Sequence, residues 1–155
     1  MWLLAVLACD GAGDPCAPSP SKGDGPTLEI GLGVGGFTPI GDGTFPLVHG
    51  PQGGFHLEIG LLATGLDTGD PAGGDLVTGA LSGVIDGQTY AETAPWLEFV
   101  CDEAAGGLVS YGTRLIYDAT PEFLDGKVTE VHASVSDLRG VEVAVDATFT
   151  IRDDP

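Results

Sequence analysis

VTEVHASVSDLRGVEVAVDATFTI, residues 128–151, is the stretch of this 155-residue chain that decides its fold. Apolar and polar residues alternate on both sides of the polar segment 136–140. Because successive side chains of a strand point to opposite faces, the alternation predicts two half-buried strands, over 128–135 and 141–151, joined as a hairpin. The second strand is expected to hold Glu142, Asp146, Thr148 and Thr150 outward and its apolar residues inward, namely Val141, Val143, Val145, Ala147, Phe149 and Ile151.

The same alternation continues upstream of this hairpin. Seven further strands are predicted between clusters of Gly, Pro and Asp, over residues 27–34, 45–49, 55–63, 76–85, 89–94, 96–101 and 108–117. The dipeptide Asp86-Gly87 is the strongest two-residue hairpin signal in the chain. Apolar residues do not recur at helical spacing, so the sequence predicts an all-β domain.

Three of these strands carry predictions about which face is buried. The apolar residues of the first are expected to share a face, namely Leu28, Ile30, Leu32 and Val34. In the third, His56 and Glu58 are expected to point outward, opposite Phe55, Leu57, Ile59 and Leu61. Over 108–117, one face is expected to carry Val109, Tyr111, Thr113, Leu115 and Tyr117.

The hairpin at the end of the chain also resembles a known class of module. With Asp137-Leu138-Arg139-Gly140 in its turn, it is similar to the closing strands of bacterial immunoglobulin-like and PKD-like modules, in which an Asp-x-x-Gly turn joins the last two strands. The resemblance implies a single immunoglobulin-like antiparallel β-sandwich of about 7–9 strands over residues 27–155, and the spacing of the predicted strands agrees with it. The roughly 130 residues of this segment suffice for one core and not for two.

The start of the chain predicts export. A short apolar run precedes Cys9, and Val6-Leu7-Ala8-Cys9 resembles the lipobox of bacterial lipoproteins, in which the chain is cut before the cysteine and the thiol receives a diacylglyceryl group. The resemblance implies a signal segment over 1–8, a lipidated cysteine with a flexible Pro/Gly/Ser-rich linker over 9–26, and a lipid-anchored protein of the bacterial cell envelope that faces the periplasm or the cell surface. The alternative is that residues 1–8 form the first strand of the domain.

The other two cysteines are expected to pair. If Cys9 carries the lipid, Cys16 and Cys101 remain in a compartment that permits disulfides. A bridge between them would pin the base of the linker to the domain. The alternative is a buried free thiol at Cys101 and an unpaired Cys16 in the linker.

The charge of the chain restricts its partners. Asp and Glu number 23 against 5 Lys and Arg, which gives a formal net charge of −18. Such a chain repels nucleic acid and anionic membrane surfaces, so the lipid is the expected means of membrane attachment. The partners that remain are the membrane through that anchor and an envelope protein or polysaccharide.

Two groups of residues suggest metal binding. His49 and His56 flank a Gly/Pro loop and would bind a transition metal, with His132 or a carboxylate as third ligand, if the strand register placed them on one face. Calcium would require several oxygens, some of which Asp67, Asp70 and Asp75 would supply from one glycine-rich loop. The alternatives are that the histidines are surface and turn residues, and that the aspartates keep the surface soluble.

Catalytic motifs are missing from the sequence. It contains no Gly-x-Ser-x-Gly elbow, His-Glu-x-x-His pair, phosphate-binding glycine loop or Cys-x-x-Cys. We therefore expect no enzyme and no required cofactor, but a binding or structural module of the envelope. A metal-binding carrier or enzyme at His49 and His56 is the alternative function.

Overall fold

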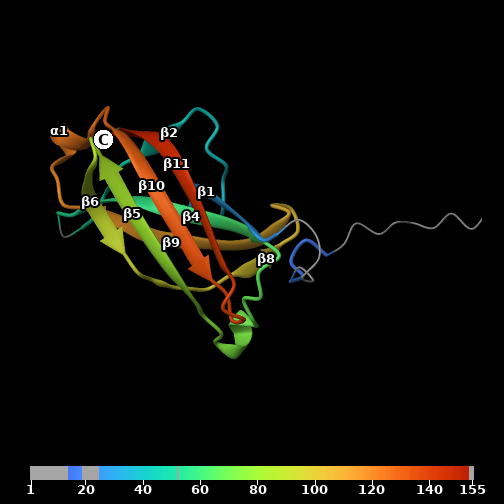
Figure 1. Ribbon diagram of the computed structural model, residues 1–155. Helices are drawn as coiled ribbons and strands as arrows, with labels where there is room; N and C mark the ends of the chain where they lie inside the picture. Colours follow the sequence, from blue (N-terminus) through green and yellow to red (C-terminus); the bar gives the residue numbers. More distant parts are fainter. Residues whose placement is uncertain (1–13, 19–24, 52, 154–155) are drawn as a thin grey trace, which may run out of the picture.

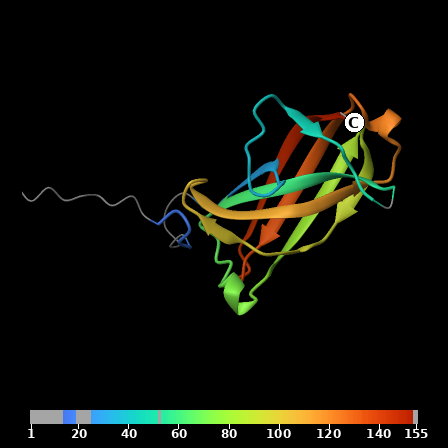
Figure 2. The same ribbon diagram turned by 180° about the vertical axis from the view of Figure 1, so that it is seen from behind.

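The computed structural model describes residues 14–18, 25–51 and 53–153, and these form two β-sheets packed face to face (Figures 1 and 2). The first sheet has the order β1 (Thr27–Leu32), β4 (Phe55–Thr64), β9 (Gly107–Tyr117) and β8 (Val100–Asp102), and β3 (Val48–His49) also pairs with β4. The second has the order β2 (Thr44–Pro46), β11 (Glu142–Arg152), β10 (Val128–Ser136), β5 (Val77–Ile85) and β6 (Gln88–Thr93), and β7 (Trp96–Leu97) also pairs with β5. Two short helical turns complete the described elements, η1 (Pro71–Gly73) and α1 (Pro121–Leu124). The predicted all-β sandwich is confirmed.

The strand order is that of an immunoglobulin-like sandwich. In that fold, strands A, B, E and D form one sheet and strands C, F and G form the other. Here β1, β4, β9 and β8 take the first set of places, and β5, β10 and β11 take the second. Every strand pair is antiparallel except β2 with β11, which is parallel.

The described residues contain 11 strands, not the predicted 7–9. The difference arises because two predicted strands, 45–49 and 96–101, each pass from one sheet to the other. In the first, β2 pairs with β11 whereas β3 pairs with β4; in the second, β7 pairs with β5 whereas β8 pairs with β9. Alternation of apolar residues reports that a segment is half-buried, but not which strand it pairs with.

A bulge in β9 overturns the predicted face of residues 108–117. Gly112 has φ of 78°, and the register with β4 shifts between Ile59 and Leu61. Leu61 therefore lies opposite Ser110, which is buried. The residues of β9 that face the core have odd numbers on the C-terminal side of the bulge and even numbers on its N-terminal side. Thr113, Leu115 and Tyr117 face the core as predicted, whereas Tyr111 points outward and is 51% exposed.

The core lies between the two sheets and confirms the predicted phase of the last strand. Phe149 and Ile151 are buried, Val143, Val145 and Ala147 pack against the core, and Glu142, Asp146 and Thr148 are exposed. The Phe149 ring contacts that of Phe45 from β2, at 5.5 Å between centroids. The predictions for Val34 and Val141 are wrong because both residues lie outside the strands and are exposed.

Two local predictions are also confirmed. Asp86 and Gly87 both have positive φ, 52° and 77°, as a two-residue turn between β5 and β6 requires. Cys16 and Cys101 form a disulfide with their Cα atoms 5.6 Å apart, and Pro18 bridges to Gly65, so the base of the linker is held to the domain. Cys9 and the predicted signal segment 1–8 lie outside the described residues.

Candidate functional site

Three adjoining hollows follow β9 of the first sheet, over its outer face and over the sheet edge beside residues 93–98. They measure about 140, 360 and 230 Å³ and are linked by shared lining residues, Glu98 and Tyr111 between the first two and Arg114 between the last two. We call this surface the β9 trough. Its main lining residues are Trp96, Glu98, Val109, Tyr111, Arg114, Ile116 and His56.

Two exposed aromatic side chains line the trough. Trp96, in the short strand β7, is 69% exposed, and Tyr111 is turned outward by the bulge at Gly112. Both line the central hollow, and among the described residues they are the large aromatic side chains that the fold leaves exposed. Because exposed Trp and Tyr leave apolar surface in water beside a polar group, their convergence makes the trough a candidate binding surface.

Charges of both signs lie beside these rings. Arg114 is opposite Glu58 in the register between β4 and β9, and Glu98 shares the central hollow with Arg114. Within residues 14–18, 25–51 and 53–153, the Arg114 guanidinium forms no ion pair or hydrogen bond. A guanidinium has five N–H donors, so these are free to bind a partner.

His56 contributes a buried polar atom to the third hollow. It points to the outer face as predicted, yet only 6% of the residue is exposed, and its Nε2 atom has no hydrogen-bond partner among the residues that the structure describes. Burial lowers the pKa of His56, the nearby Arg114 charge lowers it further, and Glu58, whose Oε1 lies 3.9 Å from Nε2, partly opposes them. The imidazole is therefore neutral near pH 7, and a buried imidazole nitrogen without a hydrogen bond costs free energy that a bound partner would recover.

The three histidines are not brought together. His49 pairs with Phe55 across β3 and β4, whereas His56 pairs with Val48, so the two histidines point to opposite faces of the sheet. His49 Nε2 lies 2.6 Å from Asp153 Oδ1, and His132 Nδ1 lies 2.8 Å from Asp146 Oδ1 in the second sheet. The shared face that a metal held by His49 and His56 requires is not formed.

Two of the three aspartates in the loop after β4 hold its backbone, and the third lies near an arginine. Asp70 Oδ1 accepts a hydrogen bond from Ala72 N at the start of η1, and Asp75 Oδ2 accepts one from Asp70 N, both at 2.9 Å. The Asp67 carboxylate lies 3.9 Å from Arg139 Nε. In the described part of the chain, the one group of three potential metal ligands within 4.8 Å of each other is Asp14, Cys16 and Cys101, whose cysteines form the disulfide. Calcium binding at Asp67, Asp70 and Asp75 stays a prediction.

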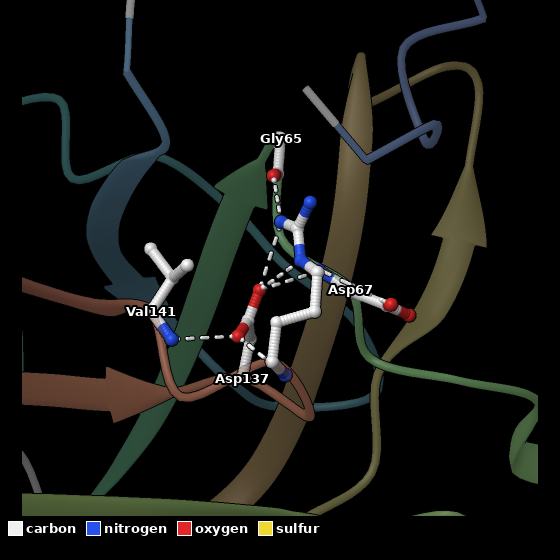
Figure 3. A network of polar contacts seen from close by, with 5 residues as sticks. Gly65, Asp67, Asp137 and Val141 are labelled. Atoms are coloured by element: carbon white, nitrogen blue, oxygen red, sulfur yellow. Dashed lines mark hydrogen bonds and ion pairs between the residues drawn. The ribbon is translucent and has the colours of Figure 1, made fainter. Parts of the chain in front are cut away.

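A second polar cluster, centred on Asp137, stabilises the end of the sandwich (Figure 3). The Asp137 side chain is fully buried, and its two oxygens accept hydrogen bonds from the backbone N–H groups of Asp67, Arg139 and Val141 and from the Arg139 guanidinium, at 2.8–3.0 Å. Burial alone would raise the pKa of Asp137, but these hydrogen bonds outweigh it and lower the pKa. Arg139 also donates to Gly65 O, so the turn between β10 and β11 is tied to the loop after β4. Every group in the cluster serves the fold, and we assign no ligand to it.

The trough was not predicted from the sequence. Its key residues become neighbours only through the bulge at Gly112 and the crossing of 96–101 between sheets. The one usable signal was Gly112 itself, because a glycine inside a strand pattern often marks a bulge.

The comparisons with known proteins add no assignment. No family model, curated protein or solved structure matches this chain. In the described residues, no helix has the length and apolar character needed to cross a membrane.

Proposed function

We propose that the chain is a lipid-anchored binding module of the bacterial cell envelope and that the β9 trough is its binding surface. The observation that carries the proposal is the convergence on one surface of two exposed aromatic rings with an arginine and a buried imidazole nitrogen. Within the described part of the chain, the arginine forms no ion pair and the nitrogen forms no hydrogen bond. The exposed rings cost solubility and the unbonded imidazole nitrogen costs stability in the free protein, and a bound partner offsets both.

The disulfide supports a function close to the membrane. Cys16 is held to Cys101, so the chain free to span between lipid and domain runs only from Cys9 to Cys16. Seven residues extend to at most about 25 Å. A spacer that must reach far from the membrane would gain from a long linker, whereas a module that binds envelope components near its anchor would not need one.

The anchor is tested by fractionation. In a Gram-negative host, the wild-type chain is expected in the detergent phase with an acyl mass on Cys9, and Cys9→Ser is expected to lose that mass and either leave the detergent phase or remain unprocessed. A wild-type chain that is soluble and carries no acyl group would refute the anchor.

The binding surface is tested with the full chain in detergent, immobilised through a C-terminal tag and exposed to a solubilised bacterial envelope extract. We expect a saturable response that Trp96→Ala and Tyr111→Ala each weaken. Val128→Ala is the matched control, because Val128 is also exposed but lies in β10 of the other sheet. No response from the wild type, or an equal response from all four proteins, would refute a binding function for the trough and favour a purely structural module.

A further inference from the structure

The form of the trough fits an extended ligand. The three hollows follow β9 from Val109 to Ile116, and at about 3.3 Å per residue this distance is about 23 Å. No single hollow encloses a compact molecule, because each is open to solvent and shares lining residues with the next. A linear chain that contacts all three in turn matches this shape.

The aromatic rings favour a ligand with apolar C–H faces. Trp96 and Tyr111 stand in the central hollow and present π-systems whose faces are electron-rich. The faces of pyranose rings carry C–H groups that pack against such surfaces, while their edges carry hydroxyl groups. A glycan chain in the trough would therefore need apolar contacts for its ring faces and hydrogen bonds for its hydroxyl groups, in alternation along the chain.

The polar groups favour hydroxyls over charged groups. Glu98 lines the central hollow, and Glu58 lies beside the trough, opposite Arg114 in the register. Both carboxylates accept hydrogen bonds only, Arg114 donates only, and neutral His56 offers its buried Nε2. A sugar hydroxyl both donates and accepts, so adjacent hydroxyls satisfy a carboxylate and a guanidinium together. An anionic polymer would meet the two glutamates as well as a net charge of −18, which opposes its approach.

The strand edge beside the trough is unfavourable for a peptide. An extended peptide would bind by adding a strand to the free edge of β9. β8 already pairs with Gly107, Leu108 and Val109, and the bulge at Gly112 interrupts the regular edge that follows. Bulges of this kind protect sheet edges against strand addition.

We infer that the β9 trough binds a neutral glycan chain, with sugar rings stacked on Trp96 and Tyr111 and hydroxyls bonded to Arg114, Glu98 and His56. This inference rests on the proposed function, because it names the ligand class of the same surface.

The test uses the immobilised full chain and the envelope extract in three forms: untreated, oxidised with periodate, and digested with protease. Periodate cleaves the vicinal diols of sugars, so we expect it to abolish the response, and we expect protease to leave it intact. The protease-resistant material is then passed over an anion-exchange resin, and the binding activity is expected in the unbound, neutral fraction. Trp96→Ala and Tyr111→Ala are expected to weaken binding at least about tenfold, whereas Tyr111→Phe, which keeps the ring, and Val128→Ala are not.

The outcomes separate the two proposals. Loss of the response after protease and its survival after periodate would overturn the glycan inference and leave the binding module standing, with a protein as its partner. Retention of the activity on the resin would overturn neutrality of the glycan. No response to the untreated extract would overturn the proposed function itself. Matching melting temperatures of the variants and the wild type establish that the losses reflect binding and not unfolding.

Discussion

At the scale of single residues, removal of the Asp137 side chain should lower the stability of the fold more than removal of any other side chain of its size. Asp137→Ala leaves the N–H groups of Asp67, Arg139 and Val141 without their acceptor. We expect the free energy of unfolding to fall by about 3 kcal/mol in chemical denaturation. The Asp146 side chain is 84% exposed and, among the described residues, bonds only to His132, so Asp146→Ala should change stability by no more than about 0.5 kcal/mol. Equal losses from the two variants would show that the Asp137 cluster does not stabilise the fold.

His56 should make stability depend on pH. Its folded-state pKa is lowered by burial and by Arg114, so between that pKa and the unfolded value of about 6.5 the unfolded chain binds more protons. Stability is therefore expected to fall as the pH drops below about 6.5. Denaturation of the wild type and His56→Gln at pH 7.5 and pH 5.5 should show the smaller loss in the variant. A loss as large in His56→Gln as in the wild type would assign the pH dependence to other groups.

At the scale of elements, β11 offers a test of phase. Phe149 is buried against Phe45, so Phe149→Ala should cost about 3–5 kcal/mol. Thr148, its neighbour on the opposite face, is exposed, and Thr148→Ala should shift stability by at most about 0.5 kcal/mol. Since a shift of one residue in register exchanges the two positions, denaturation of both variants checks the phase directly. A larger loss of stability from Thr148→Ala than from Phe149→Ala would contradict this phase of the strand.

The strands differ in how far their sequences predict them. The strand β11 and the Asp86-Gly87 turn could be predicted from local rules. The position of β11 follows from its one exposed face, and the turn follows from one pair of residues with positive φ. The splitting of 45–49 and 96–101 does not, because the choice of partner strand depends on residues far along the chain. The exposure of Tyr111 depends on a bulge at Gly112 and that of Trp96 on its place in the short strand β7, so the trough is a property of tertiary structure. The disulfide was predictable because the lipid that we propose on Cys9 leaves two cysteines to pair.

At the scale of the whole molecule, the disulfide joins the linker to the sandwich across a sequence separation of 85. Closing a loop of this length contributes about 4–5 kcal/mol in the chain-entropy model. Reduction is therefore expected to lower the melting temperature by about 10 °C, measured by calorimetry with and without reductant. The double variant Cys16→Ser with Cys101→Ser should melt at the lower temperature and be insensitive to reductant. An unchanged melting temperature on reduction of the wild type would show that the bridge does not stabilise the domain.

If the protein binds through the β9 trough, the side chains of this surface become covered when the partner is bound. Hydroxyl-radical footprinting of the full chain, with and without envelope extract and read by mass spectrometry, measures this directly. We predict that oxidation of Trp96 and Tyr111 falls on binding, while oxidation of Val128 and Leu138, which are exposed elsewhere on the molecule, stays the same. Protection at Val128 or Leu138 with Trp96 and Tyr111 still fully oxidised would contradict this prediction.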